Sequence, residues 1–272
     1  MNSIFTSPVF TMEKLNQVYI VLTSKNCNQR CKHCYIDFPM SKQVKDFIDV
    51  NRVKDMLIDT RQESLSCISL TGAEPMLHPN FNAILRMCLK RTNVCICTNA
   101  SLINEKKARF FRKVEEEGRN SLFFRISLWH FDESKNDSVR YRGAFRQSLF
   151  AIKNLEKYGF TVILEAVNYY NEDEEFFKQG FLELFSRYEI SPELFMQLYF
   201  NEDIVDYNNK TKDCMFSRTL SSNGVYSCPY LANDYRGRMG SDFKDYSKSI
   251  KAECSYCAAC SACVIADVNA DT

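Results

Sequence analysis

The chain has 272 residues, of which 45% are hydrophobic and 25% charged, a composition typical of a folded soluble protein. Lysine and arginine number 35 against 34 for aspartate and glutamate, and the net charge of +1 gives no field that would draw the chain to nucleic acid or an anionic membrane. No run approaches the roughly 20 apolar residues of a membrane span, and Met1 to Lys14 lacks the features of a signal peptide. We therefore expect a cytoplasmic protein that acts on a small-molecule or peptide substrate.

The first 200 residues alternate between short apolar runs and segments with helical spacing. Val50, Val53 and Leu57, for example, recur at intervals of three and four, which places apolar side chains on one face of a helix. Such alternation predicts an α/β fold with a parallel sheet and crossover helices. The predicted strands are approximately Gln17 to Thr23, Cys67 to Leu70, Val94 to Thr98, Phe123 to Leu128, Thr161 to Val167 and Phe195 to Tyr199.

Reactive side chains follow the first four of these strands. In chain order they are Cys27 to Cys34, Thr71 to Pro75, Asn99, and the pair Trp129 and His130. In a parallel sheet, active sites gather where the strands end and the loops begin. The sequence therefore predicts a site at the C-terminal edge of the sheet.

The composition changes after about Asn201. Cys, Gly, Asn, Ser and Asp become frequent, and periodic apolar runs become rare. A segment of this kind usually needs a metal or another staple to become ordered. We expect residues 201–272 to form a small cysteine-rich appendage that packs directly on the sheet domain of residues 1–200.

Thirteen cysteines are unusual for a chain in a reducing compartment, where a cysteine surplus indicates metal binding or catalysis rather than disulfides. Four of them lie inside apolar segments, and we interpret these as small buried hydrophobic residues. These four are Cys67, Cys88, Cys95 and Cys97.

The first cysteine group comprises Cys27, Cys31 and Cys34, with no fourth cysteine nearby. Three thiolates on a 4Fe-4S cluster leave one iron open to chelate a substrate or cofactor, whereas an electron-transfer cluster normally has four. The alternative is a zinc knuckle, for which His33 is the local candidate for the fourth ligand.

The spacing of this group, with His33 just before the last cysteine, resembles the cluster motif of the radical S-adenosylmethionine (SAM) superfamily. Further segments that resemble this family follow in order from about Val18 to Tyr199. They are Thr71-Gly72-Ala73-Glu74-Pro75, similar to the family's Gly-Gly-Glu-Pro turn; Cys97-Thr98-Asn99-Ala100, similar to Thr-Asn-Gly; Ser127-Leu128; and Asn136 to Arg140, similar to His-Asp-x-x-Arg. Two positions depart from the pattern, because Ala73 and Ala100 stand where the family has glycine.

The resemblance implies a partial (β/α)6 parallel barrel, a SAM-binding 4Fe-4S cluster on Cys27, Cys31 and Cys34, and a flavodoxin- or ferredoxin-type electron donor. It also implies roles for residues that bind SAM. Glu74 would accept hydrogen bonds from the methionyl ammonium, Gly72 and Ala73 would form the turn that approaches the methionyl group, His33 and Asn99 would lie near the adenine and ribose, and Ser127 and Arg140 are candidates for the ribose and the carboxylate.

The second cysteine group consists of six residues: Cys214, Cys228, Cys254, Cys257, Cys260 and Cys263. The run from Cys254 to Cys260 fits the ferredoxin spacing, and one structural zinc site is the alternative. With Gly224 between its first two cysteines, the group resembles the auxiliary-cluster segments called SPASM and twitch. The resemblance implies an auxiliary 4Fe-4S cluster on Cys214, Cys228, Cys254 and Cys257, while Cys260 and Cys263 are spare or begin a second cluster.

The resemblance to SPASM and twitch enzymes predicts hydrogen abstraction from a small molecule, followed by net oxidation through the auxiliary cluster. The first cluster motif begins at Cys27, which favours a small molecule over a peptide that needs a separate recognition domain. The alternatives are a maturase that cross-links or epimerises a ribosomally made peptide, and a non-catalytic metal-binding protein.

Overall fold

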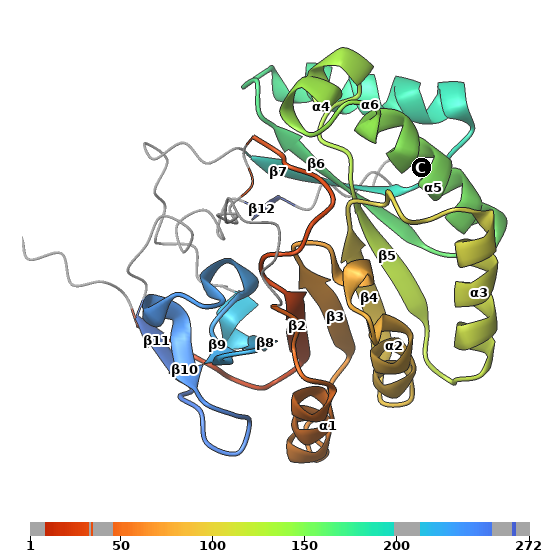
Figure 1. Cartoon of the computed structure of the whole chain (residues 1–272). Helices are drawn as coiled ribbons and strands as arrows, with labels where there is room; N and C mark the ends of the chain where they lie inside the picture. Colours follow the sequence, from red (N-terminus) through yellow and green to blue (C-terminus); the bar gives the residue numbers. More distant parts are fainter. Residues whose placement is uncertain (1–8, 33, 35–45, 199–212, 252–262, 265–272) are drawn as a thin grey trace, which may run out of the picture.

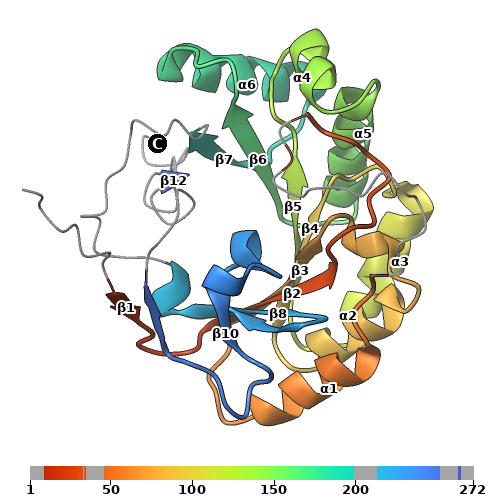
Figure 2. The same ribbon diagram turned by 60° about the vertical axis from the view of Figure 1, so that its left-hand side comes forward.

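The computed structural model describes residues 9–32, 34, 46–198, 213–251 and 263–264. Its centre is a sheet of ten strands in the order β10-β9-β8-β2-β3-β4-β5-β6-β7-β12. The sheet is curved, and the helices lie along its convex side (Figures 1 and 2). This arrangement is the predicted α/β partial barrel.

The middle of the sheet consists of the six strands expected from the sequence, and every neighbouring pair among them is parallel. They are β2 (Gln17–Thr23), β3 (Cys67–Gly72), β4 (Asn93–Thr98), β5 (Leu122–Ser127), β6 (Val162–Asn168) and β7 (Glu193–Leu198). In β5, Leu122, Phe124 and Ile126 are buried while the residues between them are half-buried, so successive side chains face opposite sides of the sheet.

The helices form the crossovers between these strands. They are α1 (Val50–Asp59), α2 (Phe81–Leu89), α3 (Glu105–Glu116), α4 (Glu133–Val139), α5 (Ala144–Lys157) and α6 (Glu174–Tyr188). Side chains at the N-caps of four of them accept a backbone hydrogen bond from the first turn, which satisfies an otherwise unpaired N–H group. The four capping residues are Asp49, Asn104, Asp132 and Asp173.

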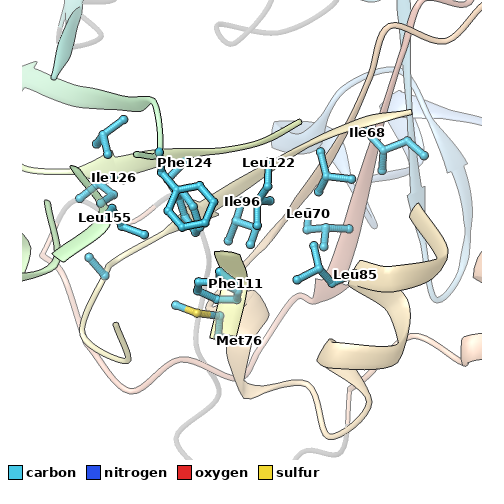
Figure 3. Packing of buried hydrophobic residues seen from close by; sticks show 14 of the residues in the cluster. Ile68, Leu70, Met76, Leu85, Ile96, Phe111, Leu122, Phe124, Ile126 and Leu155 are labelled. Atoms are coloured by element: carbon cyan, nitrogen blue, oxygen red, sulfur yellow. The ribbon is translucent and has the colours of Figure 1, made fainter. Parts of the chain in front are cut away.

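The hydrophobic core fills the layer between the sheet and these helices (Figure 3). Phe111 of α3 is fully buried, and its ring lies 5.2 Å from that of Phe124 on β5 and 6.4 Å from that of Phe81 on α2. Full burial of such a side chain stabilises the fold by about 1.5–3 kcal/mol. The core therefore fixes the strand ends that carry the predicted site.

The C-terminal part continues the main sheet, which the sequence pattern did not indicate. β8 pairs in parallel with β2, from Gln17 opposite Ser217 to Ile20 opposite Leu220. β8 was missed because its five residues include one apolar side chain, Leu220. The remaining strands are β1 (Val9–Thr11), β8 (Ser217–Ser221), β9 (Gly224–Tyr226), β10 (Arg238–Gly240), β11 (Ser249–Lys251) and β12 (Cys263–Val264). The short 3-10 helices are η1 (Pro75–Leu77), η2 (Asp213–Met215), η3 (Pro229–Leu231) and η4 (Tyr235–Gly237).

None of the helices in the described ranges has the length and apolar character needed to cross a membrane.

Candidate active site

The turn that carries the first cysteine group begins where β2 ends. The backbone N–H of Asn26 donates to Thr23 Oγ1 at 3.0 Å, and Cys27, Cys31 and Cys34 follow with half-buried side chains. Burial raises the pKa of the Cys27 thiol, so this group stays protonated until a metal displaces the proton. Within the described ranges, no three Cys, His, Asp or Glu side chains are already gathered closely enough to hold an ion. His33 lies outside the described residues.

The turn after β3 packs against the start of the cysteine turn. The N–H of Ala73 donates to the carbonyl of Thr23 at 2.8 Å, and the N–H of Glu74 donates to the carbonyl of Asn26 at 3.0 Å. Gly72 has a φ of +122°, and a Cβ at this position would lie 2.2 Å from the carbonyl oxygen of Thr23. The glycine therefore allows two strand ends to meet, in addition to any approach to a cofactor.

Glu74 lies at the centre of this packing and has no exposed surface. Its carboxylate accepts hydrogen bonds from the N–H of Met76 at 3.1 Å, from the N–H of Asn99 at 3.0 Å and from the hydroxyl of Thr98 at 2.9 Å. Burial outweighs these bonds and raises the pKa of Glu74 to about 7. The carboxylate thus links the ends of β3 and β4 and offers no open face to a ligand.

Asn99 joins the end of β4 to the cysteine turn. Its amide nitrogen donates to Asn28 Oδ1 at 2.9 Å and lies 3.6 Å from the Sγ of Cys27. The next residue, Ala100, has a φ of +66°, a left-handed conformation that L-residues with a Cβ adopt at a cost. This is the position at which the family pattern has glycine, so the backbone keeps the family's turn although the residue differs.

Arg140 closes the site from the side of α4, and 4% of its surface is exposed. It donates to the carbonyl of Ser127, to Gln29 Oε1 at 3.1 Å and to the carbonyl of Asn99 at 3.5 Å. Burial lowers the pKa of Arg140, and the neighbouring Cys31 thiol opposes this effect. The guanidinium thus ties the cysteine turn to the ends of β4 and β5.

The structure brings together Cys27, Cys31, Asn99 and Arg140, as the sequence order of the motifs predicts. Gln29 and Thr98 also belong to the network, but the sequence analysis did not single them out. Thr98 was identifiable from its place beside Asn99, whereas no local pattern marks Gln29. The Ser127 side chain is half-buried, and its carbonyl is the group that Arg140 contacts.

The two residues after Leu128 have different surroundings. Trp129 is half-buried, and its N–H is held by Asn136 Oδ1 at 3.0 Å. His130 is buried, and its Nε2 lies 2.6 Å from Glu172 Oε2. His130 also packs against the rings of Phe131 and Phe177, so it belongs to the packing beside α6.

The apolar-segment cysteines are only partly what the sequence predicts. Cys88 and Cys95 are buried, as expected, but Cys67 and Cys97 are partly exposed. The Sγ atoms of Cys95 and Cys97 are 4.0 Å apart on the side of β4 that faces away from Ile96 and the helices. A hydrogen bond from Cys95 and the charge of Arg125 lower the pKa of Cys97.

Two cysteines of the second group lie on either side of the β8–β9 hairpin. Cys214 is in η2 and Cys228 directly precedes η3, and both are half-buried. Gly224 begins β9 with a φ of +150°, and a Cβ there would lie 2.6 Å from the carbonyl oxygen of Gly240. Cys263 begins β12, opposite Gln197 of β7. Three further members lie outside the described residues: Cys254, Cys257 and Cys260.

Comparison with known proteins identifies the family. The sequence profile of the radical SAM superfamily matches residues 21–179, which is more than half of the chain. The chain belongs to the radical SAM superfamily. Enzymes of this superfamily use a 4Fe-4S cluster and SAM, so the chain is a radical SAM enzyme.

Two characterised relatives are similar over about half of the chain. The antilisterial bacteriocin subtilosin biosynthesis protein AlbA of Bacillus subtilis (strain 168) is 31% identical over 141 residues, 50% of this chain and 30% of AlbA. The GTP 3',8-cyclase of Chlorobaculum tepidum (strain ATCC 49652 / DSM 12025 / NBRC 103806 / TLS) is 30% identical over 146 residues, 52% of this chain and 41% of the cyclase. The matched region therefore spans less than half of either relative.

Solved structures of low sequence identity share the fold. Native anSMEcpe with bound AdoMet has a TM-score of 0.65 at 14% identity, covering 85% of this chain and 79% of that one. BtrN in complex with AdoMet and 2-DOIA has a TM-score of 0.51 at 15% identity, again covering 85% of this chain and 79% of that one.

Proposed function

We propose that the chain removes a hydrogen atom from its substrate with a radical derived from SAM and completes a net oxidation by passing the remaining electron to an auxiliary cluster. Cys27, Cys31 and Cys34 hold the 4Fe-4S cluster that binds SAM. That cluster, reduced by a flavodoxin- or ferredoxin-type donor, supplies the electron that cleaves SAM to methionine and a 5'-deoxyadenosyl radical. Loss of a hydrogen atom, an electron and a proton leaves the substrate oxidised by two electrons.

The observation that carries this proposal is the buried network around the cysteine turn. Asn99 and Arg140 contact this turn from the ends of β4 and from the segment after α4. Glu74 connects the ends of β3 and β4 beneath it. The three elements meet at the C-terminal edge of the parallel strands, which is where such folds place their catalysis.

The same network refines the roles proposed for SAM-binding residues. Because the Glu74 carboxylate is already shared among three donors, its effect on the methionyl group passes through the position of the Gly72–Ala73 backbone. Asn99, Ser127 and Arg140 remain our candidates for the ribose and carboxylate, with His33 beside the adenine. Arg140 is thereby a positioning residue for the cysteine turn as well as a cation near the cofactor.

For the auxiliary cluster we propose Cys214, Cys228, Cys254 and Cys257 as ligands, with Cys260 and Cys263 spare or starting a second cluster. The β8–β9 hairpin between the first two, with Gly224 at its turn, supports this assignment. Residues 201–272 then form a twitch- or SPASM-like segment, appended to the radical SAM barrel of residues 1–200. Its strand β8 extends the barrel sheet, so the two parts share one backbone ladder.

The substrate class has two candidates. A small molecule is the expectation from the sequence, and the fold shared with BtrN in complex with 2-DOIA accords with it. A ribosomally made peptide is the second candidate, because the AlbA match is to a bacteriocin biosynthesis protein and the fold is also that of anSMEcpe with a bound Kp18Cys peptide.

Anaerobic reconstitution tests the proposal. We expect about eight iron atoms per chain, from two cubane clusters, and formation of 5'-deoxyadenosine from SAM with a chemical reductant. The triple variant Cys27→Ala/Cys31→Ala/Cys34→Ala should keep about half of the iron and form no 5'-deoxyadenosine. Cys67→Ala, which removes a thiol at the opposite end of β3, is the matched control and should retain both. A colourless protein that binds zinc, or a triple variant that still cleaves SAM, would contradict the assignment.

A further inference from the structure

Arg218 of β8 is buried in an unusual environment. None of its surface is exposed, although it carries a full positive charge. Its guanidinium donates to four backbone carbonyls, and its carbon lies 5.9 Å from the centroid of the Tyr246 ring. The carbonyls belong to Cys214, Ser217 at 2.7 Å, Ser247 at 3.4 Å and Lys248 at 2.8 Å.

This charge has no carboxylate partner among the described residues. No Asp or Glu oxygen there lies within 4.0 Å of the guanidinium, and the buried Nε donates to no acceptor. Carbonyl dipoles satisfy hydrogen bonds but do not neutralise a cation, and an unpaired buried charge is costly. The position of Arg218 therefore calls for an anion that side-chain carboxylates do not supply.

The contacts of Arg218 indicate where that anion lies. One carbonyl belongs to Cys214 itself, and two belong to Ser247 and Lys248, which precede the cysteine run that starts at Cys254. The guanidinium thus clamps the two stretches of chain that bring the auxiliary cysteines together. Arg140, the other buried arginine in the described ranges, stands in the same relation to Cys31 and Cys27.

We infer that Arg218 is the counter-charge of an auxiliary iron-sulfur cluster ligated by Cys214, and that it raises the reduction potential of this cluster. The inference rests on the auxiliary cluster of the proposed function. A cubane with four thiolate ligands is an anion, and its reduction adds a further negative charge. A nearby buried cation favours the reduced form, since net charge and burial set such potentials. This makes the cluster a better acceptor for the electron that substrate oxidation releases.

The test measures the auxiliary cluster by itself. In the Cys27→Ala/Cys31→Ala/Cys34→Ala background, the remaining cluster is titrated with a reductant and followed by electron paramagnetic resonance. Arg218→Gln, which keeps amide donors for the carbonyls but no charge, should shift the potential to a more negative value. Arg218→Lys keeps the charge and should stay close to the parent. Arg238→Gln, at an exposed arginine that donates to the carbonyl of Asn223, is the matched control and should cause no shift.

A second measurement concerns the cluster-free full-length chain. Without the cluster the cation lacks its partner, so Arg218→Gln should unfold at a urea concentration equal to or higher than that of the parent. If this variant cannot fold, Arg218 serves its carbonyl hydrogen bonds alone and the inference is wrong.

The outcomes separate the inference from the function on which it rests. If the unaltered chain binds only about four iron atoms, the auxiliary cluster does not exist and both are overturned. If the second cluster is present but its potential is the same in Arg218→Gln and the parent, the counter-charge role is refuted while the proposed oxidation stands.

Discussion

Replacing Glu74 by glutamine should change the way in which the stability of the chain depends on pH. The carboxyl group is fully buried, and its pKa is raised from an ordinary 4.5 to about 7. In the folded chain the group therefore keeps its proton between these values, while in the unfolded chain it has lost it. Because the folded state binds more protons in this window, stability falls as the pH rises from 4.5 to 7 and is constant above it.

The magnitude follows from the two pKa values. Each tenfold change in proton affinity is worth about 1.4 kcal/mol, so ionisation of Glu74 costs the folded state about 3 kcal/mol in full. Glutamine resembles the protonated acid in shape and does not ionise. The free energy of unfolding of Glu74→Gln should therefore gain about 3 kcal/mol on that of the parent between pH 4.5 and pH 7.5.

The assay is urea unfolding of the cluster-free chain under anaerobic, reducing conditions at a series of pH values. Other groups, such as His130 with its lowered pKa, titrate in both proteins and cancel in the difference. Glu116→Gln removes the same charge from an exposed position on α3 and should track the parent. Parallel curves for Glu74→Gln and the parent would show that burial does not dominate the ionisation of Glu74, and the reasoning would fail.

Three further predictions concern single residues. Ala100→Gly relieves the left-handed conformation at φ +66° and should raise the free energy of unfolding by about 0.5–1 kcal/mol in a urea titration; a loss of stability would contradict this. Gly72→Ala forces a Cβ to within 2.2 Å of the Thr23 carbonyl and should cost about 2–5 kcal/mol in the same assay, so unchanged stability would show that the strand ends do not meet as described. Once a substrate is known, mass spectrometry should find a product lighter by two hydrogen atoms, with one 5'-deoxyadenosine per turnover. A product of unchanged mass that gains deuterium from heavy water, and is lost in Cys97→Ala, would instead indicate epimerisation.

The central strands were predictable because their side chains alternate between two environments. β2 was placed at Gln17–Thr23 from the sequence, and the structure has the same bounds. β8 was not predictable in this way, since its side chains are mostly polar and its pairing with β2 joins residues 200 positions apart. A local pattern cannot report a partner at that distance.

The candidate site shows the same division. The residues that follow each strand were identified from their order along the chain, because parallel strands bring their C-terminal ends together. The burial of Glu74 and the contacts of Arg140 with Gln29 and Asn99 depend on how the loops pack, which the order does not specify. Sequence reasoning therefore located Glu74 correctly but described it as an open ligand, whereas the structure uses it as a buried link.

The charges of the site explain why that link is neutral. The thiol of Cys27 and the carboxyl of Glu74 each raise the pKa of nearby acids, and both are driven towards the protonated form by burial. When thiolates replace the thiols around a cluster, their negative charge opposes ionisation of Glu74 still further. Glu74 then adds no charge at neutral pH, and Arg140 is the buried group that faces the anionic cluster. A neutral acid beneath the turn and a cation beside it favour electron uptake by this cluster, which is the step that SAM cleavage requires.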